Sequence, residues 1–332
     1  MIQTQPVAAC LGLDVAKHKL DACLLLGSHT RHAQFDNSAS GLAALRAWCQ
    51  RHGAATPATV LEATGRYGEL AAGGLHAAGH LIHLANPRRI KKYAESLGRR
   101  NKTDRLDAEV IARFGATQDL PAWQPAEPAQ QRLRGLLRRL ADLELMLRAE
   151  RNRQEAQVDP LLTKSLARIV RALEKESVRL QELITAHVQT TATLRDEVER
   201  LCAIEGIGTR SAWWLCAELP RHLPNGRTAA AWLGVTPRVR QSGSSLRSTA
   251  PAGTEGNRHL RRVLFMAAMV ARRHNPRLKA FADRLAAAGK AKLAILLAVL
   301  HKLLKIAFAL LKNQSAYDPT HRPFATTKLI QN

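Results

Sequence analysis

Four acidic residues in the first third of the chain have the type and spacing that chemistry requires. Asp104 and Asp107 stand three residues apart at the start of a predicted helix, so both face the same way. Asp14 lies near the end of a first predicted strand, and Glu62 near the end of a fourth. Carboxylate oxygens are hard ligands that suit Mg²⁺ or Mn²⁺ better than zinc. Such ions activate a nucleophile and stabilise a leaving oxygen, so the four acids predict metal-dependent phosphoryl transfer.

Each acid also has an ordinary structural interpretation. Asp14 and Glu62 could simply terminate their strands. Asp104 could be a helix N-cap, where Asp is favoured. Asp107 could be an acid at the third helical position that complements the helix dipole. We favour the metal site because all four acids occur within one predicted fold.

Basic residues surround the acidic pair and dominate the whole chain. Arg99, Arg100, Lys102 and Arg105 flank Asp104, and Lys102 is a candidate for direct phosphate contact, or else a solvated surface lysine. The chain has 50 Lys and Arg against 27 Asp and Glu, a net charge of +23. A charge of this size favours a polyanionic partner, nucleic acid first and anionic membrane second. Aromatic residues are only 4%, too few for a stacking platform, so phosphate contacts should dominate.

Serines and arginines are interleaved in a second cluster near residue 242. Its members are Ser242, Ser244, Ser245, Ser248, Arg238, Arg240 and Arg247. A serine hydroxyl attacks only when its surroundings activate it, and arginines stabilise charge on a phosphoryl transition state. The cluster could form a covalent serine–DNA bond. From spacing alone, a loop whose hydroxyls donate hydrogen bonds to phosphate is the favoured interpretation.

The elements that must position the acids form an α/β domain over residues 1–125. Hydropathy and turn residues predict three strands, then helix, strand, helix, strand and helix. An Asp on the first strand and an acid on the fourth resemble the RNase H-like fold of RuvC resolvases.

Two further regions follow. Residues 126–200 have the apolar spacing of two long helices and predict an antiparallel coiled-coil hairpin, serving as a spacer or oligomerisation arm. Residues 201–332 are predicted to be mostly helical, with the serine loop and a helix-hairpin-helix-like element at "EGIG" (205–208) that offers backbone N–H groups to a phosphate. An apolar stretch at 291–311 is interrupted by His301, Lys302 and Lys305, which favours a packed helix over a membrane span.

The five cysteines form no CxxC and no zinc-finger spacing, so they are interpreted as buried hydrophobes in a reducing cytosol. No signal peptide is recognised. A cytoplasmic, nucleoid-associated protein is expected.

Several motifs together resemble the transposases of the IS110 family over nearly the whole chain. They are "GLDVAKHKLDACL", "LEATGRYG", "NKTDRLDAEVIARF", "LGVTPRVRQSGSSLR" and "GNRHLRRVLFMAAM", in this order. The resemblance implies a RuvC-like domain whose DEDD metal site is Asp14, Glu62, Asp104 and Asp107. It places the serine nucleophile before "GSS", at Ser242. Its motifs add Arg66, Arg258, Arg261 and Arg262 to the expected nucleic-acid contacts. Relatives often have proline where this chain has Glu205, which puts the phosphate contact of that turn in doubt.

The resemblance further implies a partner that the residues themselves do not show. Family members are guided by a structured noncoding bridge RNA that pairs with donor and target DNA. They act as homodimers that assemble into a homotetramer, recombine through a covalent serine–DNA intermediate, and complete the metal site of one subunit with the serine of another.

Two other functions stay open at this point. One is a RuvC-like, metal-dependent, structure-specific DNA endonuclease in which the serine loop only binds backbone. The other is a non-enzymatic nucleic-acid-binding protein in which the charge serves architecture alone. The ordered acids count against the second.

Overall fold

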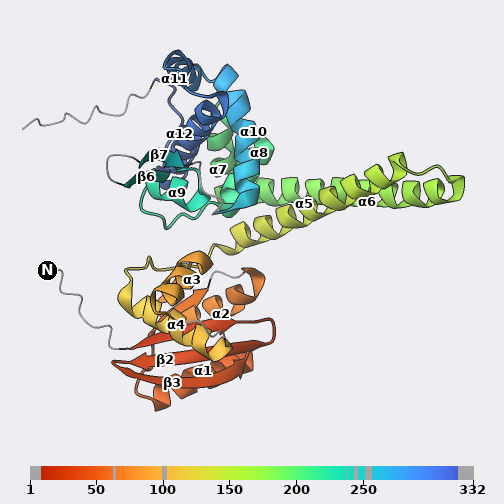
Figure 1. Ribbon diagram of the computed structural model, residues 1–332. Helices are drawn as coiled ribbons and strands as arrows, with labels where there is room; N and C mark the ends of the chain where they lie inside the picture. Colours follow the sequence, from red (N-terminus) through yellow and green to blue (C-terminus); the bar gives the residue numbers. More distant parts are fainter. Residues whose placement is uncertain are drawn as a thin grey trace, which may run out of the picture. The chain divides into compact units, whose positions relative to one another are not determined.

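The computed structural model describes residues 9–62, 65–98, 103–236, 238–242, 246–250 and 256–320, with backbone only for 65–66, 238–242 and 246–250. The chain forms two compact units, Met1–Pro125 and Ala126–Asn332 (Figure 1). They are called unit 1 and unit 2 below.

Unit 1 is built on a mixed five-stranded sheet in the order β3-β2-β1-β4-β5. Its strands are β1 (Cys10–Val15), β2 (Lys19–Leu26), β3 (His29–Asp36), β4 (Ala58–Glu62) and β5 (Ile82–Ala85). The first three are antiparallel neighbours, whereas β4 runs parallel to β1 and to β5. The helices are α1 (Ala39–Arg51), α2 (Gly65–Ala77), α3 (Pro87–Ser96) and α4 (Asp104–Thr117). The predicted order of strands and helices is confirmed as far as β5, after which two helices, α3 and α4, follow where one was predicted.

Alternation along β1 separates two hydrophobic cores. Leu11 and Leu13 pack in one core with residues of α1 and α2, such as Leu45. Cys10 packs in the other core with residues of α4, such as Ile111. Successive side chains of a strand point to opposite faces, so Cys10, Gly12 and Asp14 share the face that α4 covers.

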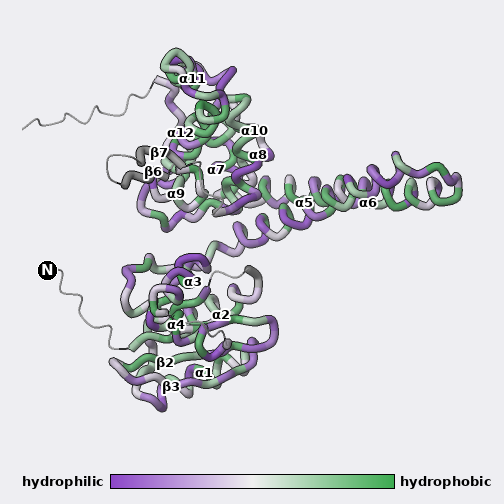
Figure 2. Tube along the Cα trace, in the orientation of Figure 1, coloured by the Kyte–Doolittle hydropathy of each residue, from purple (hydrophilic) through white to green (hydrophobic). Residues whose placement is uncertain are grey.

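Unit 2 begins with a two-helix arm, α5 (Pro128–Glu155) and α6 (Pro160–Thr190), which lie side by side in Figure 1. Figure 2 shows hydrophilic and hydrophobic residues interleaved along both helices. Leucines of α5, including Leu137 and Leu140, are buried in the same cluster as Leu180 and Ile184 of α6. That cluster continues into the rest of unit 2, so residues 126–200 share its core. The coiled-coil supercoil and a separate domain over 126–200 stay predictions.

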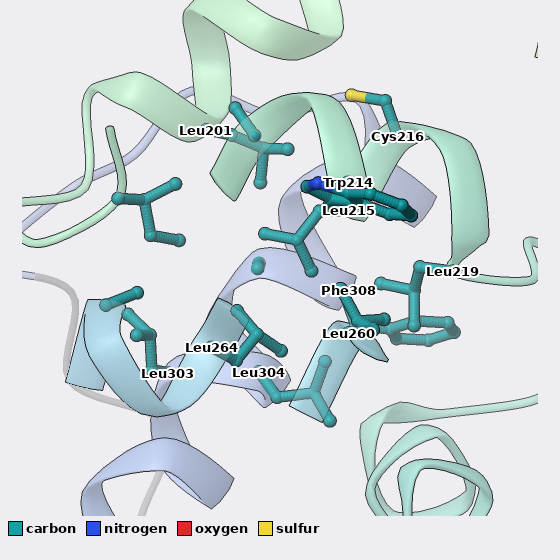
Figure 3. Packing of buried hydrophobic residues seen from close by; sticks show 14 of the residues in the cluster. Leu201, Trp214, Leu215, Cys216, Leu219, Leu260, Leu264, Leu303, Leu304 and Phe308 are labelled. Carbon is teal, nitrogen blue, oxygen red and sulfur yellow. The ribbon is translucent and has the colours of Figure 1, made fainter. Parts of the chain in front are cut away.

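Six further helices lie in the described part of unit 2. They are α7 (Ala192–Cys202), α8 (Thr209–Glu218), α9 (Gly226–Leu233), α10 (Arg258–His274), α11 (Pro276–Ala287) and α12 (Lys292–Asn313). Figure 3 shows Trp214 and Leu215 of α8 packed near Leu260 of α10 and Phe308 of α12. Within the described part of the chain, α12 alone is long and apolar enough to cross a membrane. Half of its apolar window is buried in the unit, as in the core helix of a globular protein.

The turn between α7 and α8 is set by packing against α10. Gly206 has a φ of 108°, and a Cβ there would lie 2.6 Å from the Cα of Ala271. Glycine is therefore required both by the backbone and by the close approach. Glu205 accepts a hydrogen bond of 2.9 Å from the Nδ2 of the buried Asn275, which gives it a structural role. Phosphate binding at this helix-hairpin-helix-like turn stays a prediction.

The segment around the serines is not simply a loop. β6 (Arg238–Ser242) and β7 (Leu246–Ala250) form a two-stranded antiparallel sheet in which Ser242 pairs with Leu246. The register also places Val239 opposite Thr249, and β-branched residues favour extended backbone. The prediction of a loop was wrong for these residues, because the many serines and arginines are typical of loops and only a few β-branched residues indicate a strand.

A buried carboxylate joins three parts of unit 2. Glu218, at the end of α8, is 6% exposed. It accepts two hydrogen bonds from Arg138 of α5, at 2.9 and 3.2 Å, and one from the Nδ2 of Asn257, at 3.0 Å. Asn257 is also the N-cap of α10, accepting from the Leu260 N–H at 3.0 Å. The arginine offsets the cost of burying the charge.

Candidate metal centre

The absence of a side chain at Gly12 lets α4 lie directly on β1. A Cβ there would stand 2.3 Å from the carbonyl oxygen of Ala108 and 2.3 Å from the nitrogen of Ala112. Gly115, three residues after Ala112 on α4, is equally close to β4, because a Cβ there would lie 2.3 Å from the Cγ2 of Val60. These approaches fix α4 across the two central strands, with its first turn over their carboxyl ends.

The first turn of α4 carries both predicted aspartates. Its N-cap is Thr103, whose hydroxyl accepts from the Leu106 N–H at 3.3 Å. Asp104 is therefore the first helical residue rather than the cap, and Asp107 is the fourth rather than the third. The N-cap alternative for Asp104 is therefore wrong, because Thr103 supplies the capping oxygen. Asp107 still lies in the first turn, where its charge complements the helix dipole, one position further along than predicted.

Three of the four predicted acids meet at this point. One carboxylate oxygen each from Asp14, Asp104 and Asp107 can be chosen so that all three lie within 4.8 Å of one another. Asp104 is exposed, whereas Asp14 and Asp107 are half-buried. Glu62 is not part of this cluster, but the register sets it beside Asp14. Gly12 pairs with Val60, and the two acids each lie two residues further along parallel neighbouring strands.

The chemistry of the cluster fits a hard divalent cation. Three like charges so close together repel one another unless a cation lies between them. Two oxygens bound to one Mg²⁺ at about 2.1 Å are at most about 4.2 Å apart, so small side-chain rotations would close the site. Asp14, Asp104 and Asp107 could hold one ion, and Glu62 lies at the end of the neighbouring strand.

Two polar residues beside the cluster were missed by the sequence analysis. The Lys19 ammonium is 2.5 Å from an oxygen of Asp104 and 3.1 Å from Asp21. These contacts, that with Asp104 foremost, raise the pKa of Lys19. Asp21 stands directly opposite Asp14 in the β1–β2 ladder and accepts a 2.8 Å hydrogen bond from Gln34. The sequence feature that could have revealed them is the spacing in "KLD", which puts the side chains of Lys19 and Asp21 on one face of β2.

The predicted nucleic-acid contacts are distributed over both units. Arg105 is exposed on α4, and its charge adds to burial in lowering the pKa of His32. Arg258 and Arg262 are exposed in the first turns of α10, where acidic residues would be the usual choice. Arg261, half-buried, donates to the Gly234 carbonyl at 3.5 Å. Arg99, Arg100 and Lys102 lie outside the described residues, as do the side chains of Arg66, Arg238, Arg240 and Arg247.

The predicted nucleophile, Ser242, is the last residue of β6 in unit 2. Its backbone is described, but its hydroxyl is not. The carboxylate cluster belongs to unit 1. The two halves of the predicted chemistry therefore sit in different units of the chain.

Comparison with known proteins gives consistent matches along the sequence. Residues 11–166 match a transposase family of the DEDD type of IS110, and residues 198–283 match the transposase family IS116/IS110/IS902. The pilin gene-inverting proteins of Moraxella bovis and Moraxella lacunata are each 32% identical over 321 residues, covering 93% of this chain and 97% of the relative. A probable family 20 transposase of Pseudomonas aeruginosa is 29% identical over 227 residues, covering 57% of this chain and 64% of the relative.

Proposed function

The chain belongs to the IS110 family of transposases and acts on DNA as a transposase or recombinase, and we propose that its phosphoryl transfer depends on the carboxylate cluster of unit 1. The family implies an RNase H-like fold for unit 1, in keeping with its mixed five-stranded sheet. The observation that carries the proposal is the approach of Asp14, Asp104 and Asp107 within 4.8 Å. Glu62, beside Asp14 at the end of β4, is the fourth ligand.

When bound, Mg²⁺ or Mn²⁺ would supply charge for the scissile phosphate and for the leaving oxygen. The residues of the chain have two tasks around it. The carboxylates of α4 and those at the carboxyl ends of the central strands β1 and β4 would hold the ion. Lys19 and Arg105 keep positive charge next to them, where a DNA phosphate is attracted.

Ser242 is the proposed nucleophile. Its hydroxyl attacks the phosphorus of one DNA phosphodiester and loses its proton, and the P–O bond to the neighbouring deoxyribose breaks as that oxygen takes up a proton. The new serine–phosphate ester replaces the broken phosphodiester bond, so the strand can be rejoined without another source of energy. Support comes from the family match over residues 198–283 and from the arginines on both sides of the serine.

The family resemblance extends the proposal to partners and assembly. We propose a structured bridge RNA that pairs with donor and target DNA, and a homodimer that assembles into a homotetramer. The +23 charge is suited to both nucleic acids. Such a protein would work in the cytoplasm at the nucleoid, where its DNA lies.

The test mixes the protein with Mg²⁺, RNA transcribed from its element, and labelled donor and target DNA. After denaturation, DNA that stays attached to protein is measured. An adduct is expected for the wild type and none for Ser242→Ala. Asp104→Asn is expected to abolish the adduct as well, whereas the exposed Asp119→Asn on the same unit should leave it unchanged.

Two results would redirect the proposal. Metal-dependent cleavage that survives Ser242→Ala without any adduct would make the protein a RuvC-like endonuclease. Full activity in Asp14→Asn and Asp104→Asn would remove the cluster from the chemistry.

A further inference from the structure

Unit 2 carries a group of cations on two helices that pack together, α11 and α12. Arg277 and Arg284 each stand about one turn from Phe281 on α11, one before it and one after it, so the three residues share one helix face. Lys302 and Lys305 are likewise three residues apart on α12, which packs against α11. The Nζ of Lys302 lies 3.8 Å from the centroid of the Phe281 ring, and the Cζ of Arg284 lies 5.6 Å from it. Arg277, Arg284, Lys302 and Lys305 are called the α11–α12 cation cluster.

No acidic side chain forms an ion pair with this cluster in the described part of the chain, although Glu205 lies in the neighbourhood of Arg277, since both charges act on Tyr317. Within the described ranges, no carboxylate lies within 4.0 Å of any of the four cations. Burial, and then the charges of Arg277, Arg284 and Lys305, lower the pKa of Lys302. The folded unit thus holds Lys302 in a place that disfavours its charge.

The charges of Lys302 and Lys305 stand on an otherwise apolar helix, although both side chains have packing contacts, Lys302 with the Phe281 ring and Lys305 with Gly226 at the start of α9. Lys302 and Lys305 interrupt a helix whose neighbouring residues, Leu303, Leu304 and Ala307, are buried in the core. Phe281 packs against the hydrophobic core of the unit, and Lys302 and Arg284 lie over its ring. Uncompensated repulsion in a folded protein is typical of a site that a ligand of opposite charge completes.

We propose that the α11–α12 cation cluster binds successive phosphates of a nucleic-acid backbone. Two guanidinium groups can each engage a phosphate with paired hydrogen bonds, and the two ammonium groups add point charges. The ring of Phe281 is occupied by cations, so the contact is with phosphate and not by base stacking. The inference rests on the proposed function, because it adds a nucleic-acid contact in unit 2 to the reaction in unit 1. DNA and RNA offer the same phosphate chemistry.

The test compares two variants of equal charge change. Arg284→Gln with Lys305→Gln removes two cluster charges, whereas Lys279→Gln with Lys290→Gln removes two exposed charges that lie outside the cluster. Affinity for a labelled DNA duplex and a labelled RNA hairpin is measured over a series of salt concentrations. The cluster variant is expected to bind one of them about 10-fold more weakly, with the slope of log K against log salt smaller by about two phosphate contacts. The control variant should change much less.

The outcomes distinguish DNA from RNA as the source of the bound phosphates. A loss confined to DNA assigns the cluster to DNA, and a loss confined to RNA assigns it to RNA. Equal, small losses in both variants would overturn the proposal. Adduct formation is scored in parallel. If the wild type forms the adduct and the cluster variant binds nucleic acid normally, only the proposal for the cation cluster fails. If the wild type forms no adduct and the cluster variant binds more weakly than the control, only the serine mechanism fails.

A second variant guards against misfolding. Lys302→Met keeps an apolar stem over Phe281 and removes the charge. Its thermal unfolding midpoint is expected to match or exceed that of the wild type, because a repelled charge is gone, while its nucleic-acid affinity falls. Reduced stability with unchanged affinity would mean that Lys302 is structural.

Discussion

The ammonium of Lys19 on β2 lies 2.5 Å from a carboxylate oxygen of Asp104 on α4. One lysine thereby connects the sheet to the helix that carries two of the candidate metal ligands. Its other contact, with Asp21 at 3.1 Å, is held in turn by Gln34. A cation that belongs to the chain therefore competes with a metal ion for the oxygens of Asp104.

Removing that cation should tighten metal binding. At about 5 Å in water, a single charge and a divalent ion repel by roughly 1 to 2 kcal/mol before screening. Lys19→Gln is therefore expected to bind Mn²⁺ about 3- to 10-fold more tightly in a calorimetric or EPR titration. Lys17→Gln, an exposed neighbour in the same hairpin, is the control and should change little. Weaker Mn²⁺ binding in Lys19→Gln would show that the lysine orients Asp104 for the metal instead.

Gly12→Ala tests the contact that places α4. The new Cβ would lie 2.3 Å from backbone atoms of Ala108 and Ala112, and backbone cannot swing aside as a side chain can. Unit 1 is expected to lose about 3 kcal/mol or more in its free energy of unfolding, at the upper end of overpacking costs. Metal affinity should fall with it, because α4 carries Asp104 and Asp107.

A matched glycine on α2 has the opposite expectation. A Cβ on Gly73 meets nothing within 4 Å, and helical Ala is favoured over Gly by about 0.5 to 1 kcal/mol. Gly73→Ala should therefore leave unit 1 as stable as before or slightly more so. Equal behaviour of the two variants in denaturant titrations would contradict the packing of α4 on β1.

His80 should make unit 1 sensitive to acid. It is 3% exposed, and its Nδ1 lies 3.0 Å from the Thr59 hydroxyl oxygen, whose own proton goes to the Pro57 carbonyl. The Nδ1 is therefore the protonated nitrogen, and a second proton on Nε2 would be buried without an acceptor in the described structure. Burial, and then the charge of Arg46, lower the pKa of His80.

The sign of the effect follows from linkage. Between the lowered pKa in the folded state and 6.5 in the unfolded state, the unfolded chain binds the extra proton. The free energy of unfolding of unit 1 should thus fall as pH drops from about 7 to about 5. His80→Gln should flatten this dependence, leaving the part due to His32, whose pKa is also lowered. The exposed His29→Gln is expected to behave like the wild type.

The separation of Ser242 and the carboxylates between two units permits a mixing experiment. Asp14→Asn and Ser242→Ala are each expected to be inactive alone. If the serine of one subunit acts at the carboxylates of another, equal mixtures should recover part of the wild-type recombination, because some sites receive both intact halves. Mixtures as inactive as either variant would show that each subunit uses its own serine.

Much of unit 1 could be predicted from the sequence because its signals are local. Apolar alternation, the Ser38 cap of α1 and the glycine and proline breaks define the strands and helices in their correct order. The convergence of Asp14, Asp104 and Asp107 also follows, since strand ends and a helix start were placed correctly.

Other features depend on contacts between distant residues. The sequence shows that Gly12 is small but not that Ala108 and Ala112 will occupy its space. Lys19 looks like an ordinary strand-end lysine until α4 brings Asp104 to it. In the same way, Arg277 and Lys302 are separated by 25 positions and become neighbours only when α11 folds onto α12.

The buried Glu218 gives unit 2 the mechanics of a lever. Arg138, in the arm, and Asn257, which caps α10, are bound to the same carboxylate. A tilt of the arm against α10 must stretch or break one of these bonds, so a force applied to the arm is transmitted to the first turn of α10. A load on the arm therefore also acts on the helix that carries Arg258 and Arg262.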